Sequence, residues 1–207
     1  TVPGVGTHVV YNALAAIAAA RRVGLSEDEV LHALAALPAT ERRFEPKVAA
    51  GITVFDDTYN MNPESARAAL RAMSGLPGSG RRIAVFGEML ELGEASESLH
   101  RELGAQVEAT GQDILVAVGA GAAPIAEGAI VAGMPAQRVH RVADVESARL
   151  LLLEMLRPED RVVCKASRRV ALDRLVDDLL AELQAGSQST SSQAAAGAAR
   201  RDREEGA

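Results

Sequence analysis

The chain has 207 residues, of which 48% are hydrophobic, and a formal net charge of -6. This length and hydrophobic content allow a buried core in one or two domains and exclude a disordered protein. An acidic chain lacks the basic face that nucleic acids require, and no apolar run approaches the roughly 18 uncharged residues of a membrane span. The N-terminal sequence has no signal-peptide pattern. We therefore expect a cytoplasmic protein with neither nucleic-acid nor membrane partners.

The first patterned part of the chain is rich in alanine and predicts two helices. GTHVVYNALAAIAAARRVG (residues 6–24) has apolar residues at helical spacing and ends in two arginines and a glycine. SEDEVLHALAALP (residues 26–38) begins with Ser26 and Glu29 at capping-box spacing and stops at Pro38. After this segment the helical period gives way to short β-branched runs, which predicts a domain boundary near residue 46.

From residue 47 to residue 185 the chain alternates between strand and helix patterns. The expected strands are ITVFD (52–56), RIAVFG (82–87), DILVAVG (113–119), QRVHRV (137–142) and DRVVCK (160–165), each followed by an amphipathic segment of helical length. This alternation predicts an α/β fold with a mostly parallel, Rossmann-like sheet and helices on both faces. RFEPKVAAGITVF (43–55) could add an antiparallel strand through a hairpin.

Two smaller features complete this organisation. Residues 186–207 contain no large apolar side chain, which predicts a disordered tail. Cys164 lies in an apolar run, which favours a buried structural thiol over a nucleophile or a metal ligand.

The most polar strand end is FDDTYN (55–60). Ligands of parallel sheets bind beyond the carboxyl ends of the strands, where this segment lies. Asn62 and Pro63 directly after it are typical of a helix N-cap and first turn. The aspartates before them admit two interpretations: ordinary hydrogen bonding within a turn, or a carboxylate that accepts from the ribose diol of a nucleotide. The residues alone do not decide between the two.

Four segments, in the same order, resemble the Mur ligase family, in the branch that adds D-alanyl-D-alanine. DDTYNMNPES (56–65) resembles its DDSYNANP motif, and IAVFGEMLELGEASESLHRELG (83–104) is similar to its GDMLELG segment with the following His. GTHVVYNALAAIAAA (6–20) resembles the end of the central domain, and VVCKASRRVALDRLV (162–176) resembles the VKGSR segment. The resemblance implies that residues 1–46 are the last helices of the central ATP-binding domain and that residues 47–185 are the Rossmann-like C-terminal ligase domain.

The resemblance also implies a reaction and its partners. In this family ATP phosphorylates a carboxylate of the UDP-N-acetylmuramoyl-tripeptide, and the amine of D-alanyl-D-alanine attacks the acyl phosphate, releasing ADP and phosphate. The implied cofactors are ATP and Mg²⁺, with the magnesium ligands mostly in a part of the ligase that precedes this chain. The full-length ligase is expected to be a monomer that acts in peptidoglycan synthesis.

Site residues follow from the resemblance by position. Arg43 and Lys165 are expected to be catalytic, with Arg43 at the ATP phosphates. Ser167 and Arg168 are expected to face the dipeptide. The residues expected to bind ATP are Asp57 at the ribose, Tyr59, Asn60, Asn12 and His8.

Other polar side chains receive no chemical role. Glu88 and Glu91 could be taken for a metal pair, but they lie in a loop whose backbone shape we expect to matter more, so no metal ligand is assigned. His100, on the helix that follows, is interpreted as a surface or packing residue.

The chain departs from the family pattern at three positions and lacks one motif. Val9 replaces an asparagine, while Arg42 and Ala166 replace glycines; Ala166 would be strained if its backbone needed a positive φ. No G-x-x-x-x-G-K-[ST] phosphate loop occurs in the chain. We therefore expect the C-terminal portion of a longer ligase, inactive alone.

One alternative from another functional class stays open. VGAGAAP (118–124) matches the first two glycines of a dinucleotide-binding loop, which would suit a non-catalytic, Rossmann-like nucleotide-binding module.

Overall fold

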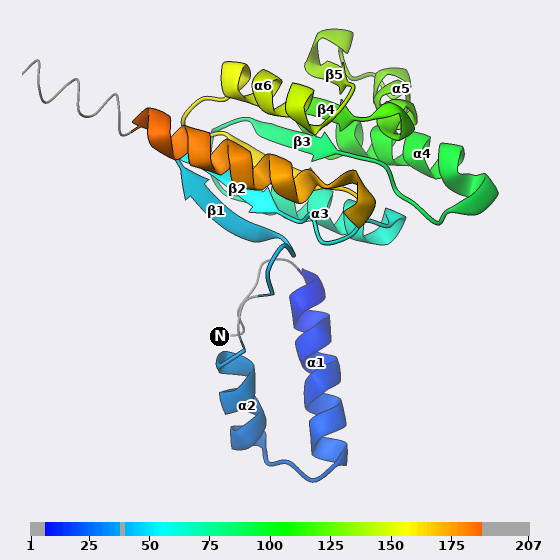
Figure 1. Ribbon diagram of the computed structural model, residues 1–207. Helices are drawn as coiled ribbons and strands as arrows, with labels where there is room; N and C mark the ends of the chain where they lie inside the picture. Colours follow the sequence, from blue (N-terminus) through cyan, green and yellow to red (C-terminus); the bar gives the residue numbers. More distant parts are fainter. Residues whose placement is uncertain (1–6, 38–39, 188–207) are drawn as a thin grey trace, which may run out of the picture.

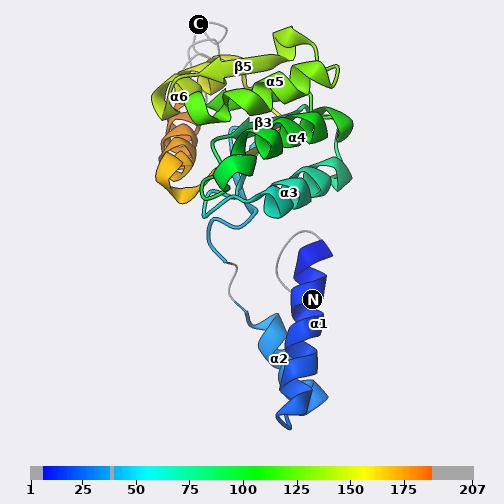
Figure 2. The same ribbon diagram turned by 90° about the vertical axis from the view of Figure 1, so that its right-hand side faces the viewer.

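The computed structural model describes residues 7–37 and 40–187, which form a helical hairpin and a sheet domain (Figure 1). The hairpin consists of α1 (Thr7–Arg22) and α2 (Glu27–Ala35). The two helices pack through a small cluster made by Ala13, Val30 and Leu34. Figures 1 and 2 show the hairpin projecting away from the sheet domain. The capping box of Ser26 and Glu29 is present, as predicted.

The sheet domain contains one six-stranded sheet. Its strands are β1 (Glu45–Ala49), β2 (Ile52–Asp56), β3 (Arg82–Phe86), β4 (Ile114–Val118), β5 (Val139–Val142) and β6 (Arg161–Lys165). Their order is β1-β2-β6-β3-β4-β5, with β1 antiparallel to β2 and all other pairs parallel. Ala50 and Gly51 join β1 to β2 with φ of 50° and 75°, as a two-residue hairpin turn requires. All predicted strands, including the hairpin strand, are confirmed.

Helices cover both faces of the sheet, which confirms the predicted α/β class (Figure 2). One face is covered by α3 (Pro63–Gly75), α4 (Ser96–Ala109) and α5 (Ala123–Val131); the other is covered by α6 (Val145–Met155) and a helix over residues 172–187. Short 3-10 turns lie at η1 (Gly93–Ala95), η2 (Ala120–Ala122), η3 (Ala136–Arg138) and η4 (Arg168–Val170). Neighbouring strand residues point to opposite faces, so Val54 and Phe55 belong to different cores.

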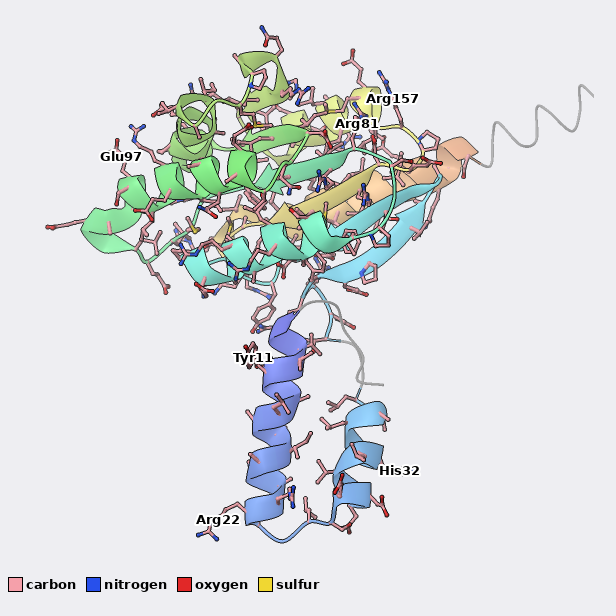
Figure 3. All side chains as sticks on the ribbon, turned by 180° about the vertical axis from the view of Figure 1, so that it is seen from behind. Tyr11, Arg22, His32, Arg81, Glu97 and Arg157 are labelled. Atoms are coloured by element: carbon pink, nitrogen blue, oxygen red, sulfur yellow. The ribbon has the colours of Figure 1, made fainter. Side chains whose placement is uncertain are left out.

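The position of β6 determines where the candidate site forms. It is the last strand in the sequence, yet it lies between β2 and β3. The carboxyl ends of β2, β6 and β3 therefore lie next to one another, and the line of strand ends that they form is the carboxyl edge of the sheet. At the opposite ends of these strands, Arg81 pairs with Asp160, which lies just before β6. Figure 3 labels Arg81 and Arg157 in this region.

The structure also bears on the remaining expectations. Cys164 is fully buried, and burial beside Asp56 raises the pKa of its thiol, as suits a structural cysteine. The last helix continues through residue 187, and the rest of the predicted tail lies outside the described residues. The predicted domain boundary near residue 46 falls within β1 and stays a prediction. No helix of the described chain is long and apolar enough to cross a membrane.

Candidate functional site

An ion pair between Asp57 and Lys165 lies at the centre of the carboxyl edge. The parallel pairing of β2 with β6 places the two residues side by side, and the backbone N–H of Asp57 donates to the carbonyl of Cys164. Lys165 Nζ lies 2.8 Å from Asp57 Oδ2 and donates to the carbonyl of Asn60 at 2.8 Å. The side chains of Lys165 and Asp57 are 3% and 13% exposed. The ammonium is thus enclosed by the FDDTYN turn.

The two adjacent aspartates have different roles. Asp56 is fully buried, accepts from the backbone and hydroxyl of Thr58, and pairs with Lys47 at 2.7 Å, so it stabilises the turn. Asp57 is turned toward Lys165, and its Oδ1 accepts from the N–H of Phe44 at 3.2 Å. The Asp57 side chain is 13% exposed, so part of it is accessible from the carboxyl edge.

The charge state of Lys165 reflects competition between burial and its partner. Burial lowers the pKa of this ammonium from its ordinary value, and the positive charge of Arg43 acts in the same direction. The Asp57 carboxylate opposes both effects through its charge and its hydrogen bond. The lysine is a buried cation whose protonation depends on Asp57.

Tyr59 and two arginines form the outer surface of the cluster. The guanidinium carbon of Arg43 lies 4.4 Å from the centroid of the Tyr59 ring, and that of Arg168 lies 5.6 Å from it. Tyr59 is 44% exposed. Two exposed guanidinium groups beside an accessible ring suit an anionic ligand that also has a flat face.

The loop after β3 is attached to this cluster through Ser167. Its N–H donates to the carbonyl of Glu88, and its Oγ accepts from the N–H of Leu90 at 2.8 Å. The Met89 N–H between them donates to His100 Nε2 at 2.8 Å, while Nδ1 lies 2.6 Å from the carbonyl of Ser96. His100 is buried and holds the loop in place.

Sequence reasoning missed this role of His100. One signal was available, because His100 is four residues after Ser96 on one helix face, where its ring can bond the carbonyl one turn earlier. The second partner is a backbone N–H in a loop eleven residues away, and no side-chain pattern shows it.

The condition for strain at Ala166 is not met, whereas Arg42 has an unfavourable backbone conformation. Ala166 is not among the residues with positive φ. Its methyl fits because the neighbouring Gly87 has no side chain; a Cβ there would lie 2.7 Å from that of Ala166. Arg42 has φ of 56°, and its guanidinium pairs with Asp173 and Asp177 on the last helix.

The structure brings most predicted site residues together. The residues at the carboxyl edge are Arg43, Asp57, Tyr59, Asn60, Lys165, Ser167 and Arg168. Asn12 is exposed on α1, in the hairpin, next to Tyr11, which Figure 3 labels outside the sheet domain. The side chain of His8 lies outside the described residues.

The part of the chain that the structure describes contains no group of three or more His, Cys, Asp or Glu side chains that could hold a metal ion.

The fold and the site define an α/β domain that places Arg43, Arg168 and Lys165 at the carboxyl ends of its parallel strands. The chain belongs to the Mur ligase family: residues 42–168 match the family described as Mur ligase, glutamate ligase domain.

The chain is similar to known ligases of one kind. It is 34% identical over 180 residues to the UDP-N-acetylmuramoyl-tripeptide--D-alanyl-D-alanine ligase of Bacillus subtilis, covering 86% of this chain and 39% of that protein. It is 40% identical over 193 residues to the ligase of the same name from Mycobacterium leprae, covering 86% and 37%. The chain thus spans about two fifths of the length of these relatives.

Solved structures agree. A crystal structure of MurF from Acinetobacter baumannii has a TM-score of 0.76 at 30% identity, covering 86% of this chain and 39% of that one. MurF ligase from Thermotoga maritima in complex with ADP has a TM-score of 0.72 at 27% identity, covering 86% and 39%.

Proposed function

We propose that this chain is the C-terminal part of an ATP-dependent, ADP-forming ligase that joins D-alanyl-D-alanine to UDP-N-acetylmuramoyl-tripeptide, in the cytoplasm. The observation that carries the proposal is the convergence of Asp57, Lys165, Tyr59 and two exposed arginines at the carboxyl edge of a domain similar to ligases of that name. The ADP in the Thermotoga maritima relative supports the use of ATP.

In the proposed reaction a phosphoryl group passes from ATP to the terminal carboxylate of the tripeptide, giving an acyl phosphate and ADP. The dipeptide amine then attacks the acyl carbon, the carbon–oxygen bond to phosphate breaks, and the amine loses a proton as the amide forms. Negative charge moves between oxygens throughout, so fixed cations stabilise the transition state. Arg43 and Arg168 are accessible enough to contact the phosphates.

We assign Asp57 to the ribose diol and Lys165 to holding Asp57. Lys165 is almost fully enclosed, so its role is to keep the turn of residues 57–60 in place and to add positive charge behind it. Tyr59 and Asn60 then form the wall of the nucleotide site. We also propose that Asn12 and His8 face this site from the hairpin side.

Magnesium fits the described residues poorly, because they contain no cluster of metal-binding side chains and the Asp57 carboxylate is paired with a lysine. We therefore place the ligands for Mg²⁺ outside the described residues.

The test is the whole ligase that contains this chain. ADP release should depend on both UDP-N-acetylmuramoyl-tripeptide and D-alanyl-D-alanine, and the 207-residue chain alone should release none. Asp57→Ala should raise the KM for ATP about tenfold or more, the value of one lost charge-assisted hydrogen-bond pair. An unchanged KM would remove the ribose assignment. Sub-micromolar NAD binding to the isolated chain would favour the non-catalytic nucleotide-binding module instead.

A further inference from the structure

The three residues that lead into β1, residues 42–44, all contact the FDDTYN turn. The carbonyl of Arg42 accepts from the N–H of Tyr59 at 3.1 Å, and the guanidinium of Arg43 lies over the ring of the same tyrosine. The N–H of Phe44 donates to the Asp57 carboxylate at 3.2 Å. The position of Arg43 at the candidate site therefore depends on the path of this short segment.

The path of this segment is unfavourable for residues other than glycine. Arg42 has φ of 56° and Phe44 has φ of 54°, and a left-handed backbone is costly for a residue with a Cβ. Such a conformation persists only where the surrounding contacts hold it in place. Phe44 is held by its buried ring, which stacks on Phe55. Arg42 stands where the family pattern has a glycine, and the contacts of its side chain must hold it.

The Arg42 side chain bridges two aspartates at the start of the last helix, residues 172–187. Its Nη1 lies 3.3 Å from Asp173 Oδ2, and its Nη2 lies 2.9 Å from Asp177 Oδ2. The two aspartates are one helical turn apart, where like charges repel each other and a cation between them offsets the repulsion. The planar guanidinium has enough donors to contact both carboxylates. Arg42 thus connects the segment before β1 to the last helix.

The last helix begins close to the second arginine of the candidate site. Arg168 is the first residue of η4, and only Ala171 separates η4 from the helix. The guanidinium carbon of Arg168 lies 5.6 Å from the centroid of the Tyr59 ring. Arg42 therefore joins the two parts of the chain that carry Arg43 and Arg168.

Stability alone does not account for an arginine at position 42. Its ion pairs are partly exposed, since the side chains of Asp173 and Asp177 are 39% and 53% exposed, and such pairs contribute little to the free energy of unfolding. The left-handed backbone opposes this contribution. What the arginine adds over a glycine is a fixed connection between two segments of the site.

We propose that Arg42 is a positioning residue, whose ion pairs with Asp173 and Asp177 hold Arg43 beside Arg168 at the Tyr59 ring. The position of Arg43 is a property of this chain alone. The consequence for catalysis rests on the proposed function, in which Arg43 contacts the phosphates of ATP.

The first experiment measures the position of Arg43 by NMR in the 207-residue chain. Protons of the Arg43 side chain should be shifted upfield by the ring current of Tyr59, and Tyr59→Leu gives the value without the ring. Arg42→Gln, which removes the ion pairs, should reduce the upfield shift by half or more. An unchanged shift in Arg42→Gln would overturn the inference.

Arg149→Gln is the matched control. The Arg149 guanidinium also bridges two carboxylates, those of Glu146 and Glu182, and Glu182 is likewise on the last helix. This variant should leave the upfield shift of Arg43 unchanged. A loss of the shift in Arg149→Gln equal to that in Arg42→Gln would show a general effect of removing ion pairs from the helix and would contradict the positioning role.

The aspartates test the same connection without a change at residue 42, and so they decide the question even if Arg42→Gln fails to fold. Asp173→Asn combined with Asp177→Asn should reduce the upfield shift of Arg43 as Arg42→Gln does. Adding Arg42→Gln to this pair should reduce it no further, because all three substitutions break one connection. Additive reductions would show that Arg42 and the aspartates act separately, which would overturn the inference.

Kinetics of the whole ligase separate this inference from the proposed function. Arg42→Gln should lower kcat/KM for ATP by about three- to tenfold, and Arg43→Gln should lower it further. The variant with both substitutions should be no slower than Arg43→Gln, because Arg42 acts through Arg43.

The two possible failures differ in these assays. If the ligase turns over and Arg42→Gln leaves kcat/KM for ATP unchanged, the positioning role fails and the proposed function stands. If the ligase forms no product from its proposed substrates, the proposed function fails, and the NMR shift of Arg43 decides the positioning role independently.

Discussion

Replacement of Asp57 by asparagine should leave a buried ammonium without its counter-ion. Asparagine keeps the shape of the side chain and can still accept from the N–H of Phe44, but it removes the charge 2.8 Å from Lys165 Nζ. At that distance the pair attracts by about 6 kcal/mol at an effective dielectric constant of ~20. Removing one partner of a buried pair typically costs about 3–5 kcal/mol. Because the ammonium keeps the carbonyl of Asn60, we expect a loss of about 3 kcal/mol in the free energy of unfolding.

Urea unfolding measures this loss. The chain has no tryptophan, so far-UV circular dichroism is the suitable signal. Asp57→Asn should lower the midpoint, and Asp57→Asn combined with Lys165→Met should recover part of the loss because no unpaired charge then remains. Glu97→Gln, which breaks the exposed pair with Arg101, should barely move the midpoint. If Asp57→Asn shifts the midpoint no more than Glu97→Gln does, the enclosed ion pair is not the main stabilising contact of the turn.

Three further predictions follow from neighbouring contacts. In urea unfolding, the free energy of unfolding of Arg42→Gly should exceed that of Arg42→Ala by about 1 kcal/mol. Both variants lose the ion pairs with Asp173 and Asp177, but only alanine keeps the strain of a left-handed backbone. Equal free energies would show that the strain is absent. His100→Leu should lower the free energy of unfolding by about 1–3 kcal/mol, because the Met89 N–H loses its acceptor. The variant should also broaden the NMR signals of the loop after β3. Unchanged loop signals would show that His100 does not hold this loop in place. By NMR titration the pKa of Lys165 should lie below 10.5 and fall further in Asp57→Asn. Lys165 has a higher pKa in the unfolded chain than in the folded chain, so the unfolded chain binds more protons at pH values between these two pKa values. The free energy of unfolding should therefore rise with pH across that interval in the parent chain but not in Lys165→Met.

The strands and helices were predictable because each follows a local pattern. Ser26 with Glu29 and Asn62 with Pro63 are start signals that act within one turn of helix, and both helices begin there. The antiparallel hairpin was also predictable, because the turn at residues 50–51 is flanked by short apolar runs.

The contacts that make the site were less predictable. That Asp57 meets Lys165 depends on β6 lying between β2 and β3, and no local pattern specifies strand order. The packing of Ala166 was not predictable either, because its methyl fits against Gly87, on a neighbouring strand end.

The central position of the last strand has a consequence for biosynthesis. Until the ribosome has released residues 161–165, the β1–β2 hairpin and the β3–β4–β5 unit cannot join, and each exposes an unpaired edge. Such edges favour aggregation, so the nascent chain is most vulnerable late in synthesis. Chains that stop before Arg161 would lack both the strand that joins the two units and the lysine that holds Asp57. An incomplete copy thus has neither a continuous sheet nor the ion pair of Asp57 and Lys165.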